Sequence, residues 1–259
     1  MDYDPPMPGS IQSLERAAAI LRLLAGGERR LGLTDLSVTL GLAKGTVHGI
    51  LRTLQQEGFV EQDAETGRYQ LGAELLRLGN SYLDVHELRA RALVWSDDLA
   101  RATGESVRIG VLHHGGVLVV HHVFRPDGSR QVLEIGAMLP LHATAWGKVL
   151  VAHDPVARAE LDGVLKPFTK RTVVSPAGLD LECAVIRERG WASEREEAVE
   201  GTAGIAALIR DRRGTPLGAV GVSGAVERLT GGGEPLPALV AAVRDTARAI
   251  SRDLGASPF

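Results

Sequence analysis

Cysteine is almost absent from this chain of 259 residues, with Cys183 as its one thiol. A single thiol excludes an internal disulfide framework and a thiolate-rich zinc site, and it fits a reducing compartment. Apolar runs of about 18 residues, which a membrane-spanning helix needs, are also missing. The acidic start at residues 1–6 lacks the basic and apolar regions of a signal peptide. We therefore expect a cytoplasmic protein that makes no contact with a membrane.

Positive charge is scarce as well, since 29 Lys plus Arg residues are outnumbered by 32 Asp plus Glu residues and the net charge is −3. A chain with this charge does not coat polyanions through its overall field. Within residues 10–80, basic and acidic residues balance at eight each. Attraction to nucleic acid would have to come from the arrangement of a few side chains, which favours specific sites over general binding.

Catalytic signatures are missing too. The chain has no Walker-type phosphate loop, and the glycine-spaced stretch 218–224 lies within a strand pattern instead of at a strand-to-helix turn, which argues against a dinucleotide site. Cys183 falls on an expected helix without a nearby histidine, so it is a weak candidate for a nucleophile. The sequence therefore predicts a protein that is not an enzyme and needs no cofactor.

Two histidine pairs, at residues 113–114 and 121–122, are the feature that would suit a metal ion. Adjacent residues on a strand face opposite sides, so at most one histidine of each pair can point to a common site. We expect half-buried, hydrogen-bonded histidines and no metal site.

Two short amphipathic helices around a glycine turn are what the sequence does contain. In residues 33–40 leucines recur at three- and four-residue spacing, and Gly41 suits the turn that follows. From Ala43 to Leu54, apolar residues project to one side at about 100° per residue and leave a polar face open. A helix that reads the major groove needs this layout. The candidate DNA-contacting residues are Lys44, Gly45, Thr46, His48, Gly49 and Arg52.

A predicted hairpin follows this pair of helices. Residues 59–62 and 68–71 alternate apolar and polar side chains on either side of the turn 63–67. Such a hairpin is the wing of a winged helix-turn-helix domain. Arg68 comes just after the turn, where it is placed to meet a phosphate.

The patterns divide the chain into four parts. Residues 1–9 are expected to form a flexible tail, and residues 10–80 the winged helix-turn-helix domain. Residues 81–104 carry an apolar seam at helical spacing, which predicts a linker helix that packs on its own domain or self-associates. Residues 105–259 mix strands and helices without strict alternation, including a strand at 131–135. We expect this last part to be an α+β domain with a largely antiparallel sheet.

Five separated motifs agree with one known pattern. They are residues 10–17, 41–48, 69–72, 140–148 and 219–224. With these motifs the chain resembles the IclR family of bacterial transcription regulators over essentially its whole length. The resemblance implies a GAF-like effector domain after the winged helix-turn-helix and linker helix, a homodimer, and often a dimer of dimers. The chain departs from the family pattern at Gly45 and Gly49, where serine and arginine are frequent.

By the same resemblance, an effector pocket lies over the sheet, beside residues 141–148, an acidic loop at 194–197 and the strands at Gly204 and Ser223. Lys148 is either a cation for an anionic effector or a solvated helix residue, and the region of Gly147 serves either the ligand or helix packing. The implied effector-binding residues are Ala143, Thr144, Gly147, Lys148, Glu194 and Ser223, with Glu194 accepting from ligand hydroxyls.

Within the family, residues 44–63 and 85–95 resemble regulators of glycerol catabolism, which implies glycerol 3-phosphate as the effector. We therefore expect a ligand-responsive repressor that binds double-stranded operator DNA. A regulator of aromatic or carboxylic acid catabolism is the first alternative. A small-molecule enzyme fused to a winged helix is the second, and the lack of a convergent acid, base or nucleophile argues against it.

Overall fold

The computed structural model describes four stretches of the chain, residues 11–26, 30–84, 87–161 and 165–256. The expected tail at 1–9 lies outside the described residues. Contacts between Cα atoms divide the chain into two units, Met1–Val85 and His86–Phe259. Over the described stretches, no helix combines the length and the apolar character that crossing a bilayer requires.

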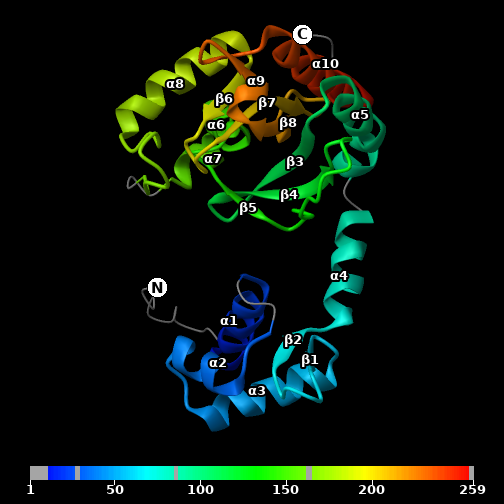
Figure 1. Cartoon of the computed structure of the whole chain (residues 1–259), viewed down its shortest axis with the longest axis vertical. Helices are drawn as coiled ribbons and strands as arrows, with labels where there is room; N and C mark the ends of the chain where they lie inside the picture. The colour runs from blue at the N-terminus through cyan, green and yellow to red at the C-terminus, as the bar shows by residue number, and fades with distance from the viewer. Residues whose placement is uncertain (1–10, 27–29, 85–86, 162–164, 257–259) are drawn as a thin grey trace. The chain divides into compact units, whose positions relative to one another are not determined.

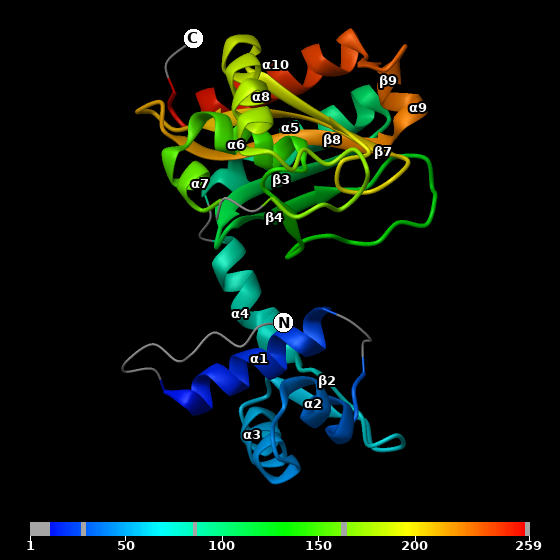
Figure 2. The ribbon, with the colours of Figure 1, turned by 90° about the vertical axis from the view of Figure 1, so that its left-hand side faces the viewer.

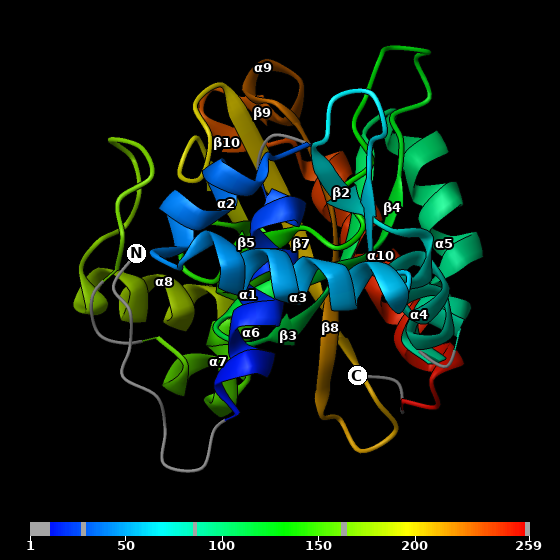
Figure 3. The same cartoon turned by 90° about the horizontal axis from the view of Figure 1, so that it is seen from below.

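The first unit consists of helices and one hairpin around a small apolar core. Helix α2 is capped at its C-terminus by Gly41, whose φ of 62° is the left-handed conformation that glycine adopts without strain. Helix α3 crosses α1 (Figure 3). The elements are α1 (Gln12–Gly26), α2 (Leu33–Leu40), α3 (Lys44–Gln56), β1 (Val60–Gln62), β2 (Tyr69–Leu71) and α4 (Ala73–Asp84). The buried core is Ile20, Leu24, Leu36, Val47, Leu51, Leu54, Val60 and Tyr69.

The hairpin β1–β2 joins this core directly. The two strands pair in antiparallel register, with Val60 opposite Leu71. Val60 and Tyr69 point into the core, and Tyr69 also forms a bridge with Leu31 ahead of α2. The predicted winged helix-turn-helix is therefore confirmed in its order of elements.

The second unit is built on one antiparallel sheet of six strands, in the order β5-β4-β3-β8-β7-β6 (Figure 1). Its strands are β3 (Ser106–His113), β4 (Gly116–Val123), β5 (Met138–Pro140), β6 (Trp191–Arg195), β7 (Thr202–Arg210) and β8 (Pro216–Ala225), with the short pair β9 (Thr230–Gly231) and β10 (Glu234–Pro235) outside it. Its helices are α5 (Glu87–Thr103), α6 (Ala145–His153), α7 (Pro155–Ala159), α8 (Pro176–Arg189), α9 (Val226–Leu229) and α10 (Pro237–Asp253).

Helices cover both faces of the sheet. Gly204 on β7 faces α6, because a Cβ added there would lie 3.2 Å from the Trp146 ring. Gly218 on β8 pairs with Ile209 of β7 and faces α5, since its Cβ would lie 2.9 Å from Leu88. Gly204 and Ile209 are an odd number of residues apart on one strand and therefore point to opposite faces. Helix α6 with α7 and α8 thus covers one face, and α5 with α10 covers the other.

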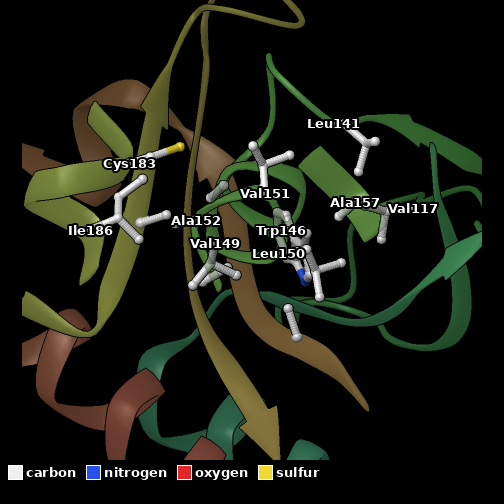
Figure 4. Packing of buried hydrophobic residues seen from close by; sticks show 14 of the residues in the cluster. Val117, Leu141, Trp146, Val149, Leu150, Val151, Ala152, Ala157, Cys183 and Ile186 are labelled. Atoms are coloured by element: carbon white, nitrogen blue, oxygen red, sulfur yellow. The ribbon is translucent and has the colours of Figure 1, made fainter. Parts of the chain in front are cut away.

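Figure 4 shows the core on the α6 face, where α6 lies between the sheet and α8. All of α6 from Ala145 to Ala152 is buried, so its sequence is apolar around nearly the whole helix. Trp146 and Leu150 are each 1% exposed and meet Ile186 and Cys183 from α8 in one cluster. This packing fixes α6 against the sheet beside a cavity described below.

The residues expected to form one linker helix, 81–104, belong to two elements. Helix α4 ends at Asp84 in the first unit and α5 begins at Glu87 in the second, and residues 85–86 lie outside the described stretches. The apolar seam of α5 packs against α10 of its own unit, which is the first of the two alternatives for this seam. The Trp95 indole N–H donates to Asp253 of α10 at 2.7 Å.

Two segments differ from the expected secondary structure. Residues 131–135 form no strand: Val132 and Leu133 are exposed, and backbone pairing with β4 begins only at Gly136, where φ is 87° and the N–H donates to the Val119 carbonyl at 2.8 Å. The expected acidic loop at 194–197 begins in strand β6, which pairs with β7. Strand β6 therefore carries Glu194 onto the α6 face of the sheet.

Candidate functional site

Helix α3 leaves a polar face open to solvent. Val47, Leu51 and Leu54 are buried against α1 and α2, which orients the helix. Lys44, Gly45, His48, Gly49 and Arg52 are exposed and Thr46 is half-buried, so the six predicted residues of this helix form one accessible surface. The surface combines cations that suit phosphates with hydroxyl and imidazole groups that suit base edges.

The two glycines of this surface are not required by packing. A Cβ added at Gly45 or at Gly49 would have no atom within 4 Å, and neither residue has a positive φ. Each glycine weakens a helix by about 1 kcal/mol relative to alanine. Because these glycines have no side chain, they allow another molecule to approach the backbone of α3 closely.

Basic side chains near the wing form a small network. The Arg68 guanidinium donates to the carbonyl of Arg30 at 3.2 Å. Arg30 in turn bonds the Asp63 carboxylate at 2.5 Å and the Gln70 side chain at 3.1 Å. The sequence did not predict that Arg30 belongs to the site, because its contacts with Asp63, Arg68 and Gln70 form only when the hairpin lies beside the segment ahead of α2.

The second unit contains a cavity of about 780 Å³ over the α6 face of the sheet. Charged and polar side chains from several strands surround it, with Trp146 and Phe168 as aromatic walls. The polar and charged lining residues are Ser106, Arg108, His122, Arg125, Ser129, Gln131, Glu134, Thr144, Glu194, Thr202, Ser223 and Arg228.

Three arginines line this cavity and give it positive charge, and each pairs with a carboxylate, Arg125 with Asp127. Arg108 pairs with Glu134, and its guanidinium lies over the Trp146 ring at 5.4 Å from the centroid. Arg228 donates two hydrogen bonds, of 2.6 and 2.9 Å, to Glu105. The cavity can therefore offer guanidinium groups to an anionic ligand if that ligand competes with these carboxylates.

Three of the six predicted effector-binding residues line this cavity, namely Thr144, Glu194 and Ser223. Thr144 caps α6, since its hydroxyl accepts from the Gly147 N–H at 3.2 Å and donates to the Pro140 carbonyl at 2.7 Å. Ser223 on β8 is half-buried and lies opposite Ser106 of β3.

Ala143 and Gly147 are absent from the cavity lining and serve packing instead. Ala143 is fully buried. A Cβ on Gly147 would lie 2.3 Å from the Leu141 carbonyl oxygen, so only glycine allows this close approach of α6 to the preceding segment. The helix-packing alternative for Gly147 is therefore the one that its surroundings support.

Lys148 is neither solvated nor in the cavity. Its side chain is 2% exposed, and its Nζ donates to Glu182 at 2.9 Å and to Glu197 at 2.7 Å. Two carboxylates already satisfy this ammonium group, so the sequence-based role as a cation for the effector is not supported by its position. A buried ion pair of this kind is costly to break, since removing one partner leaves an uncompensated charge.

Glu194 is buried at 7% exposure between the cavity and this ion-pair network. Burial raises the pKa of its carboxyl to about 7, and the neighbouring Glu197 carboxylate adds to the rise. Its Oε2 accepts from the Glu197 N–H at 3.2 Å. Near neutral pH this group therefore exists in both protonation states and can donate or accept a hydrogen bond.

His122 also lines the cavity, although the sequence did not assign it to the site. Its imidazole bonds the Ser106 hydroxyl at 2.8 Å and accepts from the Glu134 N–H at 3.2 Å, and burial lowers its pKa. The adjacent His121 faces the other side of β4, where Arg89 and Asp97 of α5 influence it. The pair thus divides between the two faces, as the alternation of a strand requires.

Comparison with known proteins identifies two family models along this chain. The IclR helix-turn-helix domain matches residues 13–64, and the C-terminal domain of the bacterial transcriptional regulator IclR matches residues 80–252.

Curated relatives are similar over nearly the full length. The chain is 70% identical to the glycerol operon regulatory protein of Streptomyces coelicolor, over 98% of this chain and 100% of that protein. It is 66% identical to the glycerol operon regulatory protein of Streptomyces griseus with the same coverage. Among solved structures, the IclR transcriptional regulator of Alicyclobacillus acidocaldarius has a TM-score of 0.82 and 25% identity, over 95% of this chain and 100% of that one.

Proposed function

Because the chain belongs to the IclR family of bacterial transcriptional regulators, we propose that it controls a glycerol operon as a repressor that glycerol 3-phosphate releases from DNA. Regulators of this family bind DNA through the helix-turn-helix domain and a small molecule through the C-terminal domain. The observation that carries the finer proposal is the 70% identity to a glycerol operon regulatory protein across 98% of the chain.

The proposed DNA contacts are made by the exposed face of α3 and by the wing. Lys44, Arg52 and Arg68 contact phosphates, while Thr46 and His48 read base edges in the major groove. Gly45 and Gly49 let the helix backbone approach the groove closely. One α3 reads half of a palindrome, so the chain acts as a homodimer with two recognition helices about one helical turn, roughly 34 Å, apart.

The proposed effector site is the cavity beside α6. Arg108 and Arg228 suit the phosphate of glycerol 3-phosphate, because guanidinium groups bind phosphate oxygens through paired N–H donors. Thr144, Glu194 and Ser223 are placed to bond the two hydroxyls. Protonation of Glu194 reduces its repulsion of a phosphate, since its raised pKa of about 7 leaves a fraction of the carboxyl neutral near pH 7.

An aromatic carboxylate is the second candidate effector, and the lining supports it through Trp146, Phe168 and Arg108. The aromatic walls suit a ring, and the guanidinium suits a carboxylate. The two relatives that are 70% and 66% identical to this chain are named glycerol operon regulatory proteins, which is why we place this class second.

Footprinting of the purified chain on DNA upstream of its own gene and the neighbouring operon tests the proposal. We expect protection of two half-sites, and release by glycerol 3-phosphate but not by glycerol or benzoate. Release by benzoate alone would move the effector to the aromatic class. Binding of the same strength to unrelated DNA would contradict the operator assignment.

A further inference from the structure

A loop of residues 124–137, here named the strap, connects β4 to β5 and forms one side of the effector cavity (green in Figure 2). It contains neither helix nor strand. Val132 and Leu133 are 75% and 57% exposed, so these two apolar side chains contribute little to holding it. Polar contacts therefore carry an important part of its attachment.

Glu134 is the side chain that ties the strap to the sheet. Its carboxylate pairs with Arg108 on β3, and its backbone N–H donates to the His122 imidazole on β4 at 3.2 Å. The other ion pair of the strap, between Arg125 and Asp127, joins two of its own residues and makes no link to the sheet.

Arg108 is positioned where it can bind an anion in the cavity. It projects from β3 into the cavity wall with its side chain 18% exposed and its guanidinium over Trp146. Over the described stretches of the chain, Glu134 is the carboxylate within ion-pair distance of it. A cation that lines the cavity is thus paired with an anion from the same chain.

We propose that Glu134 is an internal competitor of the effector: its carboxylate holds Arg108 in the ligand-free protein, and an anionic effector takes its place and frees the strap. The identity of the effector rests on the function proposed above, whereas the attachment of the strap by Glu134 does not. The ligand class that operates this exchange is a small organic phosphate with hydroxyl groups.

The physical basis is a competition for one guanidinium. A phosphate that makes paired hydrogen bonds with Arg108 occupies the donors that Glu134 uses, and two anions in contact repel each other. The exchange replaces one charge-assisted interaction of Arg108 by another, so the free energy of interaction at this guanidinium changes little. The strap then keeps its backbone bonds at Gly136 and Ala137 to Val119, while its side-chain anchor is released.

This arrangement also sets specificity. A neutral polyol such as glycerol offers nothing that compensates for breaking the pair between Arg108 and Glu134, whereas its phosphate ester does. The internal carboxylate therefore makes the cavity reject the unphosphorylated compound. Because the phosphate ester releases the strap and glycerol does not, only the phosphate ester changes the structure around the cavity.

Limited trypsin digestion of the full chain tests the attachment without any ligand. Arg130 is exposed within the strap and precedes Gln131, so cleavage at this bond reports how freely the strap moves. We expect Glu134→Gln to be cut there roughly fivefold faster than the wild type, the ratio that corresponds to an ion pair of about 1 kcal/mol. The matched control Asp127→Asn, which removes the pair within the strap, should be cut at the wild-type rate. Equal rates for Glu134→Gln and the wild type would overturn the proposal.

Calorimetric titration with glycerol 3-phosphate tests the competition. We expect Glu134→Gln to bind it roughly fivefold tighter than the wild type, and Arg108→Gln to show no binding, with a wild-type circular dichroism spectrum showing that the variant is folded. Glycerol should bind none of the three. Wild-type affinity in Arg108→Gln, or weaker binding in Glu134→Gln, would overturn the competition.

The two proposals fail in distinguishable ways. In one outcome, glycerol 3-phosphate binds neither the wild type nor the variants, while Glu134→Gln is still cut faster than the wild type. If inorganic phosphate then speeds cleavage after Arg130 in the wild type but not in Arg108→Gln, the effector assignment is wrong and the internal competition stands. If glycerol 3-phosphate binds the wild type and Arg108→Gln alike, the effector stands and the competition is overturned.

Discussion

Glu194 is a residue whose environment the sequence did not reveal. Its carboxyl is buried with a pKa of about 7, whereas an unfolded chain ionises it near 4.5. Between these values the folded state binds more protons than the unfolded state, so its contribution to stability is present below pH 4.5 and is lost as pH rises through 7. Replacing the group removes this dependence.

We therefore expect Glu194→Gln to gain stability relative to the wild type as pH rises from 5 to 8, by at most about 3 kcal/mol at ~1.4 kcal/mol for each pKa unit. Urea unfolding followed by Trp fluorescence measures this, because Trp95, Trp146 and Trp191 all lie in the second unit. The exposed Glu188→Gln on α8 is the control and should show no such trend. A constant difference between Glu194→Gln and the wild type at both pH values would contradict the assignment.

Arg52 is predicted to contact a phosphate. Arg52→Ala should weaken binding to every DNA sequence and reduce the slope of log K against log salt by about 0.9 for each phosphate that is no longer neutralised, hence about twice that for a dimer. Arg22→Ala on α1 removes the same charge in the same unit and should leave the slope near the wild-type value. An unchanged slope in Arg52→Ala would remove Arg52 from the phosphate-binding residues.

His48 and Thr46 are predicted to read bases. His48→Ala should change the ranking of affinities among operator variants, because base-edge contacts carry sequence information. Binding to a panel of single-base operator variants measures this. Equal weakening on all of them would show that His48 does not distinguish bases.

The sequence located the surface residues of α3 better than it located the cavity. Exposure on an amphipathic helix follows from periodicity, so Lys44, His48 and Arg52 could be placed from spacing alone. The cavity depends on contacts between distant strands, and Arg108 and Glu134 come together across 26 residues. One signal was present, since Arg108 interrupts the apolar run 107–112 within β3.

Among the elements, α3 contains glycines that lower the stability of the helix but allow its backbone to approach DNA closely. Gly49→Ala places a methyl group in open space, so it should stabilise the first unit by up to about 1 kcal/mol while weakening operator binding. Gly79→Ala on α4 is the matched control, because Gly79 is also an exposed helical glycine with no atom within 4 Å of an added Cβ. It should stabilise without affecting DNA binding.

Hydrogen exchange over residues 11–84 measures the stability of both variants, and fluorescence anisotropy measures their operator affinity. If Gly49→Ala and Gly79→Ala bind operator DNA equally well, close approach of the α3 backbone is not part of recognition.

Elements with strong local patterns were predicted well, and elements decided by distant partners were not. The helices around Gly41 and the hairpin after them follow from spacing and turn residues. Strand β6 was missed because its alternation, with Glu194 and Arg195, looks like a polar loop until β7 lies beside it. Residues 131–135 have a strand-like sequence, yet no partner strand covers either side of them.

The whole molecule joins a DNA-binding unit to a ligand-binding unit, and the family assignment makes it a regulator and not an enzyme, as the absence of a catalytic set predicted. We propose that the two functions are linked through the geometry of a dimer. An effector can shift such a balance only by its different affinity for the DNA-binding and released states. Reciprocity then requires operator DNA to weaken effector binding by the same factor.

The link between cavity and operator is measured by the operator dissociation constant of the purified chain at increasing glycerol 3-phosphate. We predict that the constant rises to a plateau in the wild type, typically by about 5–150-fold for a coupling of this kind, and stays unchanged in Arg108→Gln and with glycerol. A constant that is independent of glycerol 3-phosphate in the wild type would contradict the proposed regulation.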